Sequence, residues 1–290
     1  MLTNNQTLTR MKADIQLRGL SGNTHDAYLR YAEKFLKYCD RPVETLNEMD
    51  VRKFLGHLAV EKKLTPGTVN LYSAAIRFLF AVTLNRTMNY LQIPRLKVPK
   101  KLPEILSREE VTVLVAHSAN LKHRALLLTA YGSGLRVSEL ISLKTADVDS
   151  ISMRLFIRGG KGKKDRYTIL SENSLHALRD YWLQYRPKSP QGYLFPGIKN
   201  VGHLTEAAIR SAIDAALAKT NITKNVSPHT LRHCFATHLL EDGYSLLQIK
   251  EMLGHYSIQS TTVYLHLANI TSGIVSPADK MPVKFEDCPL

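Results

Sequence analysis

Basic and hydroxyl side chains gather in four short stretches between residues 132 and 264, and one of these stretches could bind an anion directly. Ser227 and Pro228 favour the start of a helix, because serine caps helices and proline fits the first helical position. His229 would then lie in the first turn, where free backbone N–H groups and the helix dipole favour a phosphate. Arg232 follows three residues later on the same side and could donate two hydrogen bonds to it.

The same stretch allows two other interpretations. In the first, His229 and Arg232 are solvated polar groups at the start of an amphipathic helix. In the second, His229 and His233, four residues apart, bind a metal. Thr230 stands where a helical zinc site would have its glutamate, and only Cys234 is near as a further ligand. We therefore expect neither a metal nor a cofactor.

The other three stretches are 132–140 (GSGLRVSEL), 160–166 (GKGKKDR) and 253–264, which contains LGHY and ends in TTVY. Together with HTLR, their order and spacing resemble the tyrosine recombinases, or λ-integrase family, and especially its Xer-like bacterial branch. The resemblance is strong over residues 106–266 and is limited to size and helix count before them. Each motif alone is a weak indication of this family, but five motifs in this order are specific for it. The family's catalytic positions fall on Arg136, Lys161, His229, Arg232, His255 and Tyr264.

The resemblance implies a reaction in which Tyr264 attacks a phosphodiester and forms a 3′-phosphotyrosine. Two arginines would neutralise the charge that develops on the phosphate, which removes the need for a metal ion. The phosphotyrosine bond would keep the energy of the cut, so rejoining would need no ATP. Lys161 resembles the family's general acid, which protonates the departing 5′ oxygen, and Lys163 is the alternative candidate. His229 and His255 would donate hydrogen bonds and transfer protons.

Acidic and further basic residues surround these motifs. We interpret Glu139 as a group that orients neighbouring basic side chains. Contacts with the DNA backbone are predicted for Lys97, Lys100, Lys101, Lys163, Lys164 and Arg166.

The composition of the 290-residue chain agrees with a polyanionic partner. Thirty-nine Lys and Arg against 25 Asp and Glu give a formal net charge of +14, an excess typical of proteins that bind nucleic acid. Three widely spaced cysteines form no evident disulfide or zinc pattern. The sequence shows neither a signal peptide nor an apolar run that would span a membrane. We expect a cytoplasmic protein without membrane contact.

Apolar periodicity predicts about four helices in the first hundred residues. Ser21, Asn47 or Asp50, and Thr65 with Pro66 are the expected helix starts. Residues 94–103 (PRLKVPKKLP) contain three prolines and four basic residues, which predicts a linker.

Beyond the linker the sequence predicts α+β structure. Ser107 and Glu110 resemble a capping box at the start of a helix. The apolar residues 125–131 predict a buried helix. Alternation from Ile151 to Ile157 with a return at 167–170 predicts a β-hairpin with a basic tip. Further helices are expected at about 172–186, 203–219, 228–241, 245–253 and 257–268.

The predicted fold is mainly α with a small β-sheet. Four parts are expected: a helical core-binding (SAM-like) DNA-binding domain at 1–93, the linker at 94–105, the catalytic domain at 106–269 and a tail at 270–290. The tail is apolar and contains prolines, so it needs a surface on which to bury its apolar side chains. It could pack on its own domain, whereas the resemblance favours exchange with a neighbouring subunit.

The partner is predicted to be double-stranded DNA with specific recombination sites, bound as a homotetramer on paired sites by a protein that is monomeric when free. A second recombinase or an accessory protein is a possible further partner. Two other functions are alternatives: a DNA-binding or DNA-bending protein without catalysis, and a type IB-like topoisomerase that nicks and relaxes DNA as a monomer.

Overall fold

The computed structural model describes residues 3–89, 93, 95–99, 102–159, 165–255 and 257–268. The chain divides into two compact units, Met1–Lys100 and Lys101–Leu290. The division falls inside the basic, proline-rich stretch. No described helix is both long and apolar enough to cross a membrane.

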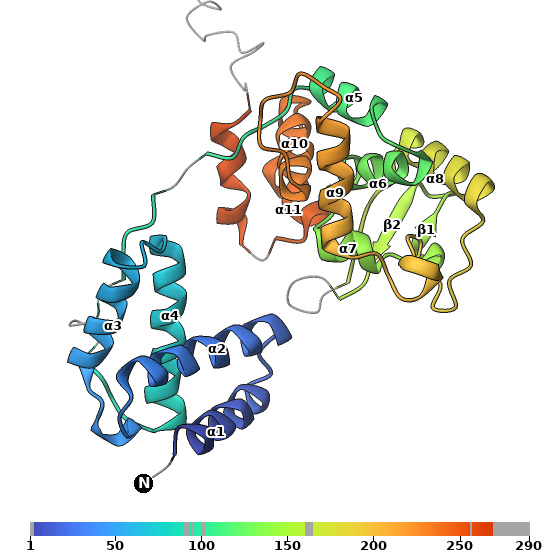
Figure 1. Cartoon of the computed structure of the whole chain (residues 1–290). Helices are drawn as coiled ribbons and strands as arrows, with labels where there is room; N and C mark the ends of the chain where they lie inside the picture. The colour runs from blue at the N-terminus through green and yellow to red at the C-terminus, as the bar shows by residue number, and fades with distance from the viewer. Residues whose placement is uncertain are drawn as a thin grey trace, which may run out of the picture. The chain divides into compact units, whose positions relative to one another are not determined.

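The N-terminal unit is helical (Figure 1). Its helices are α1 (Asn4–Leu17), α2 (Gly22–Cys39), α3 (Glu48–Val60) and α4 (Pro66–Phe78), with a 3-10 turn at Val43–Thr45 and a π-helical turn at Leu79–Thr83. The predicted starts are confirmed, because Ser21, Asn47 and Thr65 each accept a hydrogen bond from a backbone N–H in the first turn. The core contains Phe35, Phe54, Tyr72, Ile76 and Phe80.

Most of the second unit is helical as well. Its helices are α5 (Arg108–Ala116), α6 (Leu121–Gly132), α7 (Val137–Ser142), α8 (Glu172–Tyr185), α9 (Glu206–Leu217), α10 (Pro228–Glu241) and α11 (Leu246–Leu253). Short 3-10 segments lie at Thr145–Asp147, Ile198–Asn200, Ile258–Ser260 and Thr262–His266. The capping box of Ser107 with Glu110 is confirmed, as are the N-cap of Ser227 and the proline at the first position of α10.

A three-stranded antiparallel sheet in the order β1-β2-β3 accompanies these helices. The strands are β1 (Val148–Asp149), β2 (Arg154–Ile157) and β3 (Arg166–Ile169), and Leu155 pairs with Val148 on one side and Thr168 on the other. β2 and β3 form the predicted hairpin. The mainly helical class with a small sheet is therefore confirmed.

Two local predictions were wrong. Strand β2 begins at Arg154 rather than Ile151, which is 95% exposed. The Asp149 carboxylate accepts hydrogen bonds from the N–H groups of Ile151 and Ser152 and so forms a turn there. The helix expected at 257–268 is two 3-10 segments. The β-branched run Thr261-Thr262-Val263 explains part of this, because such residues are weak helix formers.

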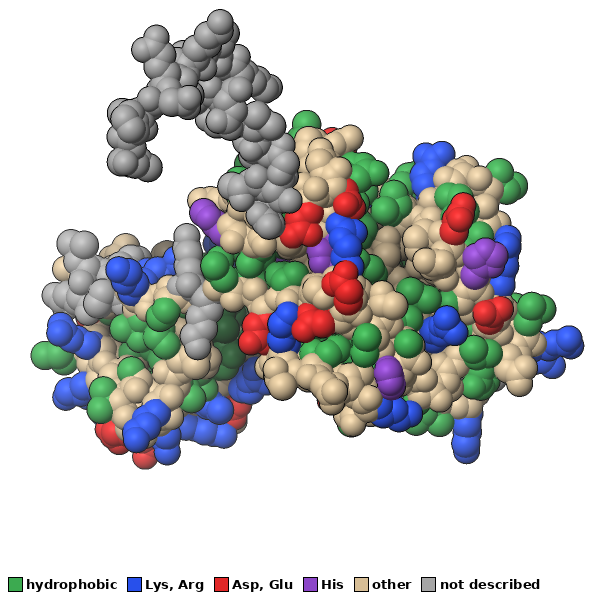
Figure 2. All heavy atoms as spheres, turned by 90° about the horizontal axis from the view of Figure 1, so that it is seen from above, with side chains coloured by type: hydrophobic (Ala, Val, Ile, Leu, Met, Phe, Trp, Pro, Cys, Tyr) green, Lys and Arg blue, Asp and Glu red, His purple; other side chains and the backbone are tan. Residues whose placement is uncertain are grey.

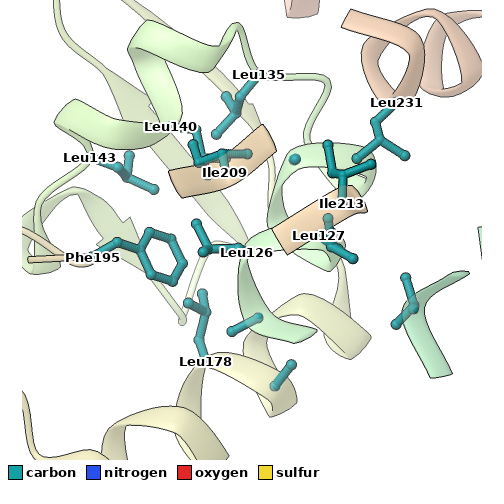
Figure 3. Packing of buried hydrophobic residues seen from close by; sticks show 14 of the residues in the cluster. Leu126, Leu127, Leu135, Leu140, Leu143, Leu178, Phe195, Ile209, Ile213 and Leu231 are labelled. Atoms are coloured by element: carbon teal, nitrogen blue, oxygen red, sulfur yellow. The ribbon is translucent and has the colours of Figure 1, made fainter. Parts of the chain in front are cut away.

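Leucine and isoleucine side chains from α6, α7, α9 and α10 form the core of the second unit (Figure 3). Leu126 and Leu127 of α6 lie between Ile209 and Ile213 of α9 and Leu178 of α8 (Figure 3). Burying such side chains contributes about 1.5–3 kcal/mol each. This packing holds the starts of α7 and α10 in place, and both helix starts carry arginines of the predicted site.

Candidate active site

Three arginines from three separate elements meet around one buried carboxylate, that of Glu139 in the first turn of α7. Arg136, the N-cap residue of α7, donates from Nη1 to Glu139 Oε1 at 2.7 Å. Arg166 of β3 donates to both oxygens, each at 2.8 Å. Arg232 of α10 places Nη1 3.6 Å from Oε2. Glu139 is only 5% exposed, so it is a shared buried counterion for the three arginines.

The C-terminal end of α11 binds the same three arginines through a second set of hydrogen bonds. Three consecutive backbone carbonyls each accept from a different one: Met252 from Arg166 Nε at 2.8 Å, Leu253 from Arg232 Nη2 at 2.7 Å and Gly254 from Arg136 Nη2 at 3.1 Å. Carbonyls at the C-terminal end of a helix carry the negative end of its dipole, which favours cations. The guanidinium positions therefore depend on where α11 ends.

The cluster keeps an excess of positive charge. Burial opposes ionisation of Glu139, but the hydrogen bonds and charges of Arg166 and Arg136 outweigh it and lower its pKa to about 2. Arg232 is 4% exposed, and burial together with the charge of Arg136 lowers its pKa to about 10. Glu139 is thus ionised near neutral pH, and the guanidinium groups of three arginines surround its single negative charge.

Tyr264 lies beside this cluster in the 3-10 segment Thr262–His266. Its side chain is 1% exposed and packs with Phe235, Ile249 and Leu253. Its hydroxyl is 3.2 Å from Nδ1 of His233. Burial raises the pKa of Tyr264, while the charges of Arg232 and Arg136 lower it in part. The two arginines thus favour the phenolate, the form of tyrosine that attacks an electrophile.

His255 follows Gly254, the C-cap residue of α11, and lies near both the arginines and Tyr264. Its ring stacks on that of Tyr264, with centroids 6.4 Å apart, and its Nδ1 is 2.9 Å from Oγ1 of Thr261. Burial and the neighbouring arginines lower the pKa of His255 to about 4. The ring is therefore neutral at physiological pH. It can exchange hydrogen bonds but adds no permanent charge.

His229 occupies the expected first turn of α10 and is exposed to solvent. It lies one helical turn before His233, whose pKa is lowered by burial and by the charges of His229 and Arg232. The structure thus brings together four sequence-predicted residues, namely Arg136, Arg232, His255 and Tyr264, with His229 at the exposed edge of the same helix.

Among the predicted DNA contacts, Lys97 is exposed in the linker. Nearby, the Asn70 amide pairs with both backbone groups of Leu96, each at 2.9 Å, so this part of the linker is attached to the N-terminal unit. The remaining predicted lysines, together with the tail 270–290, lie outside the described residues; these lysines are Lys100, Lys101, Lys161, Lys163 and Lys164.

Arg166 differs from the prediction of a contact with the DNA backbone. Its side chain is 10% exposed, and its three nitrogens donate to Glu139 and Met252. It therefore belongs to the arginine cluster rather than to the surface. Figure 2 shows that many other Lys and Arg side chains lie on the surface, interspersed with apolar and acidic ones.

Sequence reasoning also missed His233 as the partner of the Tyr264 hydroxyl. The sequence offers a role for His233 only as an alternative metal ligand, although its place one turn after His229 puts it on the same side of α10. In the described part of the chain, no three His, Cys, Asp or Glu side chains form a group that could hold a metal ion.

Comparison with known proteins agrees with this arrangement. The sequence profile of the phage integrase family matches residues 104–270, and that of the phage integrase N-terminal SAM-like domain matches residues 8–90. A putative integrase/recombinase of Sinorhizobium fredii is 41% identical over 275 residues, which cover 94% of this chain and 88% of the relative. Tyrosine recombinase XerA of Pyrococcus horikoshii is 33% identical over 264 residues, which cover 91% of this chain and 90% of the relative.

The fold recurs in a solved structure, that of the XerH site-specific recombinase in a post-cleavage complex with its palindromic difH substrate. The TM-score is 0.68 at 21% identity, and the alignment covers 94% of this chain and 83% of the other. With both units matched and relatives similar over almost their whole length, the chain belongs to the phage integrase family of tyrosine recombinases, enzymes that cut and rejoin DNA strands.

Proposed function

We propose that this protein is a site-specific recombinase that cleaves and rejoins DNA through a covalent 3′-phosphotyrosine at Tyr264, without metal or ATP. The observation that carries the proposal is the position of Tyr264 next to a cluster in which three arginines share one carboxylate. The cluster carries excess positive charge. Two of its arginines, Arg232 and Arg136, act on the nearby Tyr264 hydroxyl and lower its pKa in part.

Arg136 and Arg232 would bind the non-bridging oxygens of the scissile phosphate. During in-line attack negative charge builds up on these oxygens, and donors fixed in advance stabilise it without reorganisation. Both guanidinium groups are already held by backbone carbonyls of α11. The phosphotyrosine bond conserves the energy of the broken phosphodiester, so rejoining needs no ATP.

The departing 5′ oxygen needs a proton, which we assign to Lys161. His229 is exposed at the positive end of α10, where it can donate a hydrogen bond to the phosphate. His255 is neutral because of its low pKa, so it would exchange hydrogen bonds and relay protons rather than supply charge.

Attack requires a local movement of Tyr264. A side chain that is 1% exposed cannot reach a phosphate on bound DNA. The hydroxyl must leave the hydrogen bond with His233, and the segment Thr262–His266 must shift. Two 3-10 segments are easier to rearrange than a regular helix, because their hydrogen bonds have poorer geometry.

DNA backbone contacts are proposed for Lys97, Lys100, Lys101, Lys163 and Lys164. The recombination sites would be paired in a homotetramer that forms on DNA from free monomers. The tail 270–290 would be exchanged between subunits, and a second recombinase or an accessory protein could take part. Integration and excision of a mobile element or Xer-like resolution are the corresponding biological roles.

The test is cleavage of a nicked suicide substrate, from which the cut end diffuses away and leaves protein attached to DNA. Tyr264→Phe should form no covalent adduct on a denaturing gel while its DNA affinity in a gel shift stays close to that of the wild type. The exposed Tyr244 provides the matched control, because Tyr244→Phe should form the adduct normally. An adduct formed by Tyr264→Phe would overturn the assignment of the nucleophile.

A further inference from the structure

We propose that Arg166 is a positioning residue: it neutralises Glu139, so that the charges of Arg136 and Arg232 remain available to the phosphate. The inference rests on the proposed function of these two arginines. It concerns the origin of the excess positive charge and not the identity of the nucleophile.

The hydrogen bonds of Glu139 are divided unequally among the three arginines. Arg166 occupies both carboxylate oxygens, at 2.8 Å each. Arg136 donates one side-chain N–H to Oε1, and Arg232 is 3.6 Å from Oε2. A bidentate arginine–carboxylate pair is the strongest of these arrangements. Arg166 is therefore the main counterion of Glu139.

Arg166 itself is not placed to touch DNA. Its Nε donates to the carbonyl of Met252, and its side chain is 10% exposed. The backbone of Gly254 lies directly against it, because a Cβ at this glycine would come within 2.9 Å of Cδ and 3.1 Å of Cζ of Arg166. Because Nε and both Nη nitrogens of Arg166 already donate to Met252 and to the two oxygens of Glu139, we assign its effect on the phosphate to its neighbours Arg136 and Arg232.

Removing the charge of Arg166 would change the net charge of the cluster. Two arginines would then face one carboxylate, and Glu139 would draw Arg136 and Arg232 towards itself. The cluster would keep one excess positive charge in place of two. A misplacement of about 1 Å in such a site can cost roughly 100-fold in rate.

The test uses the full-length protein and the rate of Tyr264-dependent adduct formation at saturating DNA. Arg166→Gln keeps hydrogen-bond donors but loses the charge, and it should slow cleavage about 100-fold. Arg166→Lys keeps the charge and should stay within about tenfold of the wild type, since it loses only the bidentate geometry.

The decisive comparison is the same substitution in a background without the carboxylate charge. In the Glu139→Gln protein there is no anion to neutralise, so adding Arg166→Gln should slow cleavage less than about tenfold. The double variant keeps two excess positive charges, as in the wild type, because Arg136 and Arg232 then face no carboxylate. It is compared with Glu139→Gln alone, so a loss of about 100-fold between these two proteins would overturn the proposal even if Arg166→Gln cannot be isolated.

Arg108→Gln is the matched control. Arg108 also donates to a backbone carbonyl, that of His238, and to a carboxylate, that of Asp242. It does so away from the cluster, so cleavage should change by no more than about twofold, as for surface ion pairs in general.

The pH dependence gives a readout that a purely structural role would not change. The charged groups that face Glu139 are Arg136, Arg166 and Arg232, and the titratable groups next to these arginines are His255 and Tyr264. In Arg166→Gln, Glu139 has lost its main counterion and takes up a proton more readily as the pH falls. The rate ratio of wild type to Arg166→Gln should therefore shrink towards acid pH, and Glu139→Gln should remove this trend.

Equal losses in the two backgrounds, or an Arg166→Gln rate within about threefold of the wild type, would overturn the role of Arg166. Neither outcome would contradict the proposed function, because the test of that function is whether Tyr264→Phe forms a covalent adduct. Conversely, an adduct in Tyr264→Phe would refute the nucleophile whatever the Arg166 variants do.

Discussion

Gly254→Ala should lower the unfolding free energy of the catalytic unit by more than the cost of its backbone conformation alone. Gly254 ends α11 with φ +62°, in the left-handed region, which costs an L-residue roughly 1–2 kcal/mol. The added Cβ would also meet Cδ, Nε and Cζ of Arg166 at 2.9, 3.0 and 3.1 Å. Displacing this arginine weakens a charged hydrogen bond worth about 1.5–3 kcal/mol. The expected loss is about 2.5–5 kcal/mol in total.

Gly243→Ala is the matched control for the backbone cost. Gly243 has φ +88°, and no described atom lies within 4 Å of a Cβ built there. This substitution should cost only about 1–2 kcal/mol. The difference between the two variants isolates the contact with Arg166.

Urea denaturation followed by tryptophan fluorescence suits this comparison. The only tryptophan of the chain is Trp182 in α8, so the signal reports unfolding of the catalytic unit. Gly254→Ala should also slow DNA cleavage, because Arg136 donates to the Gly254 carbonyl. Equal losses of unfolding free energy in Gly254→Ala and Gly243→Ala would refute the packing argument.

Four further predictions concern the reaction, the assembly and the charge cluster. Lys161→Ala should cleave a normal substrate very slowly but a 5′-bridging phosphorothiolate well, because a thiolate leaves without a proton; equally slow cleavage of both would assign another role to Lys161. Cleavage should persist in excess EDTA, since arginines supply the positive charge, and a loss that magnesium restores would contradict this. A chain truncated after Asn269 should bind one site but lose cooperative assembly on paired sites in gel shifts and light scattering. Because the pKa of Glu139 is lowered from 4.5 to about 2, it should add about 3 kcal/mol of stability that is present above about pH 4.5 and is lost as the pH falls towards 2; acid denaturation of Glu139→Gln should lack this component.

The elements that begin with strong local signals could be predicted from the sequence. Ser227 with Pro228, Ser107 with Glu110, and Thr65 with Pro66 satisfy the free N–H groups of a first helical turn within a few residues. Such signals depend on neighbours in the chain and not on the tertiary fold. The order of the motifs then indicated the site residues Arg136, Arg232, His255 and Tyr264.

The role of Arg166 could not be predicted in the same way. In the sequence it stands at the end of a basic run, where contact with DNA is the natural interpretation. Its burial results from the packing of β3 against α11, 86 residues later in the chain. Likewise, the Asp149 turn overrode the alternation at Ile151 because side-chain hydrogen bonds to the backbone compete with strand pairing.

The three carbonyls at the end of α11 make the candidate active site sensitive to the rotation of this helix about its axis. Since backbone oxygens bind the arginines, the side chains at Met252 and Leu253 can vary without loss of these bonds as long as they pack. A one-residue insertion within α11 would instead rotate the end of the helix by about 100° and advance it by about 1.5 Å. All three carbonyls would then point away from their arginines, so single-residue insertions and deletions in this helix should be tolerated far less than substitutions.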